Sequence, residues 1–189
     1  MRAFIALNLP ERIKESVSGI KQKLSPDIPG ARWVKPGNLH LTLKFLGDIS
    51  PLQLEKIKKT LPGICGLTPG FRVKLDSLGI FSSPGKTGII WIGCKTPPGL
   101  ARVAKNIETG LKPAGIPEEK RAFRAHVTIA RIKTRIDSSS TKKLLGELSE
   151  SIAAGEWEFE CEKTGLFESV PGPEGPDYIM LDEFSFKAA

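Results

Sequence analysis

The chain has two histidines, His40 and His126, and each begins a pattern of histidine, apolar residue, threonine and apolar residue. An imidazole ionises near pH ~6.5, so one histidine can serve as a general base while another serves as a general acid. In a β-strand, side chains two residues apart point to the same side, so Thr42 or Thr128 would lie beside its histidine. Threonine hydroxyls can donate hydrogen bonds to phosphate oxygens. The two patterns therefore predict acid–base chemistry on a phosphate ester.

The spacing of the two patterns indicates an internal duplication. The histidines are 86 residues apart, and the same offset places residues 79–81 on 165–167 and residues 3–6 on 89–92. Solenoid repeats are shorter, usually about 20–50 residues, so this period favours two copies within one domain. We expect a single bilobal domain over 1–189, with copies at about 1–86 and 87–172 and a closing strand at 177–186. A pseudo-twofold axis between the copies would bring both histidines to one central cleft.

Alternating apolar residues predict strands and helical spacing predicts helices, which together define an α+β fold with antiparallel or mixed sheets. The expected strands cover residues 2–8, 38–46, 71–81, 88–93, 123–132, 157–167 and 178–186. The expected helices cover residues 10–24, 50–61, 100–112 and 138–153.

Basic side chains near the two histidines could offset the charge of a phosphate. Strict alternation along the strands places Lys44 on the same face as His40, and Arg124 on the same face as His126. Arg131 is a further candidate, although alternation places it on the opposite face. The charge of the whole chain supports a polyanionic partner, since residues 1–146 carry a net charge of +16 and residues 147–189 carry −9.

Other residue types narrow the chemistry. Trp33 and Phe81 could stack on a nucleobase, or they could pack in the core. Two histidines without a nearby set of carboxylates or thiolates are a poor metal ligand set, so we expect no metal. Cys65, Cys94 and Cys161 form no CxxC or zinc pattern and are expected to be reduced, buried thiols. The sequence shows neither a nucleophile elbow nor a phosphate-binding glycine loop, and we expect no cofactor.

The sequence shows no signal for a membrane. No stretch of 18 or more apolar residues occurs, so a transmembrane helix is not expected. The first ten residues lack the pattern of a signal peptide, and we therefore expect a cytoplasmic location.

The paired motifs resemble those of a known superfamily. Residues 32–34 and 38–47, together with residues 123–131, are similar to the two motifs of the two-histidine phosphoesterases. More narrowly, nearly the whole chain resembles the RNA 2′,3′-cyclic phosphodiesterases, also called 2′-5′ RNA ligases. One departure is Ala125, because the family commonly has proline before the second histidine. This change removes no catalytic group.

The resemblance implies a bilobal LigT-like fold with helices outside and a central cleft that holds one motif from each lobe. It implies hydrolysis of a terminal 2′,3′-cyclic phosphate on RNA to a 2′-phosphate without a metal, and possible reversible 2′-5′ joining of tRNA halves. His40 would be the proton donor and His126 the proton acceptor, while Thr42 and Thr128 would bind the phosphate. The residues alone leave the order of donor and acceptor open.

Two alternatives fit the same residues. The site could hydrolyse a cyclic phosphate on a small nucleotide, or the chain could be a non-catalytic RNA-binding module that retains the cleft. The uneven positive charge favours a longer polyanion such as RNA. A monomer is expected, because the site is built from two halves of one chain.

Overall fold

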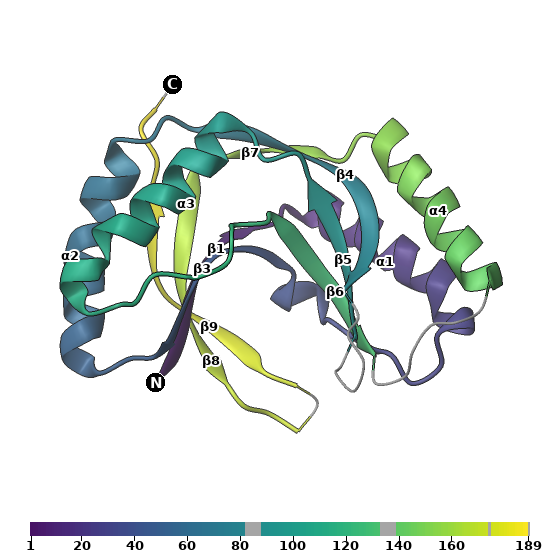
Figure 1. The fold of residues 1–189 in the computed structure, drawn as a ribbon, viewed down its shortest axis with the longest axis horizontal. Coiled ribbons are helices and arrows are strands. Elements are labelled where there is room, and N and C mark those ends of the chain that lie inside the picture. Colours follow the sequence, from purple (N-terminus) through teal and green to yellow (C-terminus); the bar gives the residue numbers. More distant parts are fainter. Residues whose placement is uncertain (82–87, 133–138, 174, 189) are drawn as a thin grey trace.

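The computed structural model describes residues 1–81, 88–132, 139–173 and 175–188 (Figure 1). Within these ranges the helices are α1 Glu11–Leu24, α2 Pro51–Gly66, α3 Pro98–Gly110 and α4 Ser139–Ala154. The strands are β1 Arg2–Asn8, β2 Arg32–Trp33, β3 His40–Asp48, β4 Phe71–Phe81, β5 Gly88–Cys94, β6 His126–Ile132, β7 Glu158–Cys161, β8 Lys163–Val170 and β9 Asp177–Ser185.

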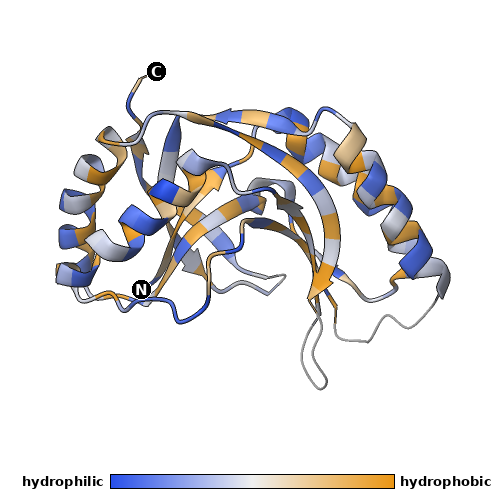
Figure 2. Cartoon of the chain, turned by 45° about the horizontal axis from the view of Figure 1, so that its top comes forward, coloured by the Kyte–Doolittle hydropathy of each residue, from blue (hydrophilic) through white to orange (hydrophobic). Residues whose placement is uncertain are grey.

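These strands form one curled sheet in the order β7-β4-β5-β6-β3-β1-β8-β9, and β2 pairs with β6. All pairings between the named strands are antiparallel. Figure 2 shows apolar and polar residues alternating along the strands, while the helices combine apolar and polar sides. The predicted α+β class with two lobes is confirmed.

Each lobe combines elements from both copies of the duplicated sequence. One lobe contains β3, β1, β8 and β9, with α2 and α3 packed together, and the other contains β6, β5, β4 and β7, with α1 beside α4 (Figure 1). The helix α1 therefore leaves the lobe of its preceding strand and covers the other lobe, and α3 does the reverse. The boundary predicted near residue 86 lies outside the described residues.

Local sequence explains how the helices begin and end. Ser50 caps α2, because its hydroxyl accepts a hydrogen bond from the backbone N–H of Gln53 at 3.2 Å, and the Gln53 side chain accepts one from the Ser50 N–H at 3.0 Å. The predicted end of this helix at residue 61 was wrong, since α2 continues through Pro62 to Gly66. Leu61 and Cys65 are both fully buried on its inner side, and this packing offsets the hydrogen bond that proline cannot donate.

Equivalent bulges interrupt the two strands that carry the histidines. In β3, Ile5 pairs with Lys44 and Ala6 with Thr42, so Leu43 is an extra residue. In β6, the same irregularity makes Ile129 the extra residue. A bulge shifts the following side chains to the other face of the strand.

The bulge at Leu43 overturns the predicted orientation of Lys44. Instead of sharing a face with His40, Lys44 has a fully buried side chain, and its ammonium group donates to Glu108 Oε1 at 2.7 Å and to the Pro117 carbonyl at 3.0 Å. Phe45, the next residue, is 59% exposed. Lys44 therefore joins β3 to α3 and to the segment that follows α3.

Loss of the Lys44 ammonium group should destabilise the fold. In Lys44→Met, the carboxylate of Glu108 would remain largely buried without its cation, and breaking such a pair costs about 3 kcal/mol of unfolding free energy. Urea denaturation would measure the loss. Lys58→Met is the matched control, because Lys58 makes a partly exposed ion pair with Asp182 at 3.6 Å and should cost less than about 1 kcal/mol. Equal stability of the two variants would contradict the assigned role of Lys44.

Candidate active site

The two histidines meet where the lobes join. Leu41 of β3 lies opposite Val127 of β6, and both side chains are fully buried. Directly opposite residues of an antiparallel pair point to the same side, so the residues on either side of this pair share the other face. His40 therefore faces Thr128 across the strands, and Thr42 faces His126. All four side chains are half-buried, with the histidines on one diagonal and the threonines on the other.

Both imidazole rings are held in the same way. The Nδ1 atom of His40 lies 2.7 Å from the Asn38 carbonyl oxygen, and that of His126 lies 2.8 Å from the Arg124 carbonyl oxygen. Because a carbonyl oxygen only accepts, Nδ1–H is the donor in both rings. The Nε2 atoms are thereby left for proton transfer, and that of His40 lies 3.0 Å from the Thr42 hydroxyl.

Aromatic side chains contact both imidazoles. The ring of His40 lies 4.8 Å from that of Phe4 and meets Tyr178 edge-on at 5.1 Å. On the other side, Phe81 meets His126 edge-on at 5.5 Å and stacks on Trp91 at 4.8 Å. These contacts restrict the orientation of both rings and remove part of their hydration.

Burial and nearby positive charge lower the pKa of His40. Burial is the larger cause, the hydrogen bond to the Asn38 carbonyl opposes it, and the charges of His126 and Arg131 lower the pKa further. The pKa of Tyr178 is raised by burial, and Arg131 and Arg2 oppose that rise. Arg131 therefore acts electrostatically on two residues of the site.

The orientation predicted for Arg131 was also wrong. The bulge at Ile129 places Ala130 in the core, where it is fully buried, and leaves Arg131 exposed on the face of His126 and Thr128. In β3 the equivalent bulge at Leu43 exposes Phe45 on the face of His40, whereas strict alternation would place Phe45 on the core face. The offset of 86 residues relates Leu43 to Ile129, so the two bulges occupy equivalent positions in the two copies.

The remaining candidates lie in different settings. Arg124 is exposed and precedes β6, which begins at His126 rather than at residue 123 as predicted. Phe81 lies at the site against His126. Trp33 of β2 pairs with Ala130 and packs, half-buried, against the hydrophobic core.

Further features of the described ranges concern metals, membranes and thiols. No group of three or more His, Cys, Asp or Glu side chains there is arranged to hold a metal ion. No helix in these ranges is long and apolar enough to cross a membrane. The cysteines form no disulfide, and burial raises the pKa of Cys65 to about 11 and those of Cys94 and Cys161 to about 12.

Known proteins share this fold and these motifs. Residues 7–91 and 92–178 each match the model of the LigT-like phosphoesterases. The chain is 33% identical over 184 residues to the RNA 2′,3′-cyclic phosphodiesterase of Archaeoglobus fulgidus, covering 97% of this chain and 99% of the relative. It is 34% identical over 187 residues to the enzyme of the same name from Aquifex aeolicus, covering 97% and 96%.

Solved structures agree with the sequence relatives. A Thermus thermophilus protein superimposes with a TM-score of 0.80 at 26% identity, covering 100% of this chain and 99% of the other. E. coli LigT complexed with 3′-AMP gives a TM-score of 0.80 at 25% identity, covering 98% and 97%. The two-lobed sheet and its paired motifs define a two-histidine phosphoesterase. Within that class, the chain belongs to the LigT-like phosphoesterase family.

Replacing Arg131 should change the titration of His40. In Arg131→Ala, loss of the positive charge should raise the pKa of His40, because protonated His40 would no longer be repelled by the guanidinium group. An NMR titration of the imidazole Cε1–H signals would follow this change. Arg131→Lys retains the charge and should leave the His40 pKa closer to that of the unmodified protein. An unchanged pKa in Arg131→Ala would contradict the electrostatic contact.

Proposed function

We propose that this protein hydrolyses a terminal 2′,3′-cyclic phosphate on RNA to a 2′-phosphate, with the two histidines as acid and base. The arrangement of His40 and His126 on one diagonal, with a threonine at each remaining corner, carries the proposal. The printed names of the Archaeoglobus and Aquifex relatives support the substrate. The structure of E. coli LigT complexed with 3′-AMP supports a nucleotide as the type of ligand.

The reaction requires proton transfer on both sides of the phosphorus atom. Water attacks phosphorus while Nε2 of His126 accepts its proton, and the bond from phosphorus to the ribose 3′-oxygen breaks as His40 gives its Nε2 proton to that oxygen. The products are a 2′-phosphate and a 3′-hydroxyl group. In-line displacement needs the acid and base on opposite sides of phosphorus, and a phosphate held between the two diagonal histidines would meet this requirement. Thr42 and Thr128 would donate hydrogen bonds to the non-bridging oxygens.

The lowered pKa of His40 fits a proton donor whose proton is supplied by binding. In the free protein, burial and the charges of His126 and Arg131 favour neutral His40. A phosphate anion placed between the histidines would favour protonated His40. The surroundings that lower its pKa also make the protonated ring a stronger acid toward the leaving oxygen.

Charged and aromatic neighbours would assist binding. Arg131 would offset the phosphate charge, as its electrostatic effect on His40 supports. Exposed Arg124 would contribute from the segment just before β6, and Phe81 would present its ring beside His126. Lys44 has no part in this proposal, since its ammonium group is bound to Glu108 and Pro117. With an RNA 5′-hydroxyl group in place of water, the same groups would form a 2′-5′ bond.

Hydrolysis of a defined RNA end would test this proposal. Protein in EDTA should convert an oligonucleotide with a terminal 2′,3′-cyclic phosphate to one with a 2′-phosphate. His40→Ala and His126→Ala should each lower turnover by about 10²–10⁴-fold, because each removes one proton-transfer group. Lys56→Ala, on the exposed side of α2, is the control and should keep full activity.

The product separates the possible failures. A 3′-phosphate product would retain the acid–base mechanism but assign the 2′-oxygen as the leaving group. An RNA end left intact by the unmodified protein would contradict hydrolysis, and near-normal turnover in either alanine variant would contradict the two-histidine mechanism.

A further inference from the structure

We propose that residues 120–124, which directly precede the strand of His126, bind the RNA strand on the 5′ side of the cyclic phosphate. Lys120 and Arg121 would contact backbone phosphates, and Phe123 would stack on a base. This inference rests on the proposed RNA substrate. It assigns residues 120–124, which we call the basic arch, to the part of the RNA beyond the reacting nucleotide, with Arg124 at the inner end next to the reacting phosphate.

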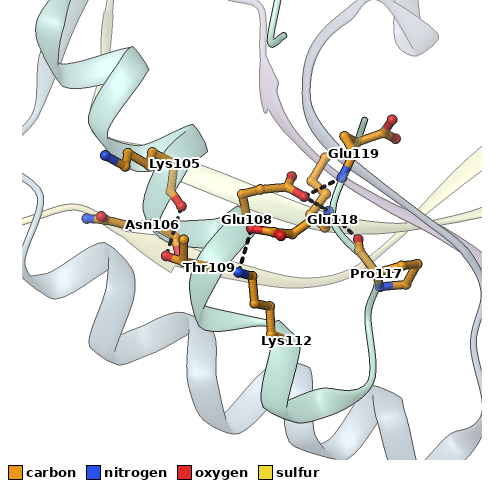
Figure 3. Close-up of polar contacts among 9 residues, drawn as sticks. Lys105, Asn106, Glu108, Thr109, Lys112, Pro117, Glu118 and Glu119 are labelled. Carbon is orange, nitrogen blue, oxygen red and sulfur yellow. Dashed lines mark hydrogen bonds and ion pairs between the residues drawn. The ribbon is translucent and has the colours of Figure 1, made fainter. Parts of the chain in front are cut away.

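The chain before the basic arch is fixed to two helices. Gln53 of α2 donates to the Gly115 carbonyl at 3.3 Å, and buried Lys44 donates to the Pro117 carbonyl at 3.0 Å. Glu108 of α3 accepts from the backbone N–H of Glu119 at 2.6 Å (Figure 3).

A second link, one residue earlier, is made to the short 3-10 turn Lys112–Ala114 that follows α3. Lys112 pairs with Glu118 at 2.6 Å, beside the contacts of Glu108 in Figure 3. Glu108 also pairs with buried Lys44 on the core side of β3. The Lys44–Glu108 pair therefore connects β3 to the start of the basic arch.

The end of the arch is fixed at the active site. Ala125 is buried with 7% of its surface exposed, and the Arg124 carbonyl accepts the hydrogen bond that orients His126. Between these two anchors, all five residues from 120 to 124 are exposed. The arch is therefore presented to solvent at a defined place next to the reacting phosphate, and its anchored ends lower the ordering cost of binding.

The charges on the arch are available to a ligand. Lys120, Arg121 and Arg124 form no ion pair with any residue in the described parts of the chain. No acidic residue occurs from Lys120 to Arg131, and the carboxylate of Glu118 is paired with Lys112. Unpaired cations that follow one another along an exposed segment match the regular negative charge of a nucleic-acid backbone.

Phe123 adds a contact suited to unpaired bases. Its side chain is 37% exposed, and it stands between Arg121 and Arg124. Binding sites for single strands combine a positively charged track with aromatic side chains on which bases of any sequence can stack. The composition of the arch therefore favours single-stranded RNA over a small anion, which would need no aromatic surface outside the histidine site.

The experiment compares two substrates of different length. The Lys120→Ala/Arg121→Ala variant is assayed on adenosine 2′,3′-cyclic phosphate and on RNA of about ten nucleotides with the same end, within the ~4–16 nucleotides typical of single-strand sites. We expect kcat/KM for the oligonucleotide to fall on the order of tenfold while that for the mononucleotide is unchanged. The slope of log kcat/KM against log salt, between about 50 and 200 mM, should become shallower by about 1.4, or ~0.7 per lost phosphate contact.

Matched variants distinguish an effect of the basic arch from an effect of the protein's total charge. Lys56→Ala/Lys59→Ala removes the same charge from the exposed side of α2 and should leave the salt slope for the oligonucleotide nearly unchanged. Phe123→Ala should lower kcat/KM for the oligonucleotide severalfold. Phe123→Trp should keep kcat/KM near that of the unmodified protein, because it retains an aromatic ring.

Each contrary result has a distinct meaning. An equal loss on both substrates would overturn the proposal, because the arch would then act only through His126. Unchanged kinetics on the oligonucleotide would also overturn it. If the unmodified protein hydrolyses neither substrate, the proposed function fails. Binding of the same oligonucleotide, measured by fluorescence anisotropy, then tests whether the basic arch binds RNA. If the salt dependence of binding is the same in the Lys120→Ala/Arg121→Ala variant as in the unmodified protein, the proposed role of the basic arch is wrong, whatever the catalytic result.

Discussion

The contact between β3 and β6 at Leu41 and Val127 is the constraint on which the site depends. Antiparallel pairing at this point fixes which side chains face each other, so each histidine lies opposite the threonine of the other motif. The two buried side chains join the cores of the lobes and leave the four polar ones on the opposite face. A shift of one residue in this register would move either motif into the core. The arrangement of the two motifs and the packing of the lobes are therefore specified by the same pair.

The paired bulges determine what surrounds those four residues. Each adds a residue just after the threonine, so the side chains beyond it exchange faces. Phe45 and Arg131 are brought to the side of the histidines, while Lys44 is directed inward to Glu108. The buried ammonium group then fixes the segment that leads to His126. A local irregularity in β3 thereby links the packing of one lobe to the position of β6, the strand that carries His126.

The sequence was sufficient for the two motifs, the α+β class and most elements, because those features depend on short-range periodicity and on repetition. It was insufficient where contacts between distant residues interrupt the two-residue alternation of a strand or decide which sheet a helix covers. Alternation by two residues assigned Lys44 and Arg131 to the wrong faces, since it cannot register an extra residue. The exchange of α1 and α3 between lobes also has no local signal, because an amphipathic helix does not specify which sheet it covers.

Symmetry of the backbone is combined with asymmetry of the side chains, and this difference separates two otherwise equivalent histidines. The equivalent position after each bulge holds apolar Phe45 on one strand and cationic Arg131 on the other. His40 is enclosed by Phe4 and Tyr178, and it receives the repulsion of Arg131 across the strands. The duplicated fold therefore supplies matching positions for the two rings, and the residues that differ between the copies give the two rings different surroundings.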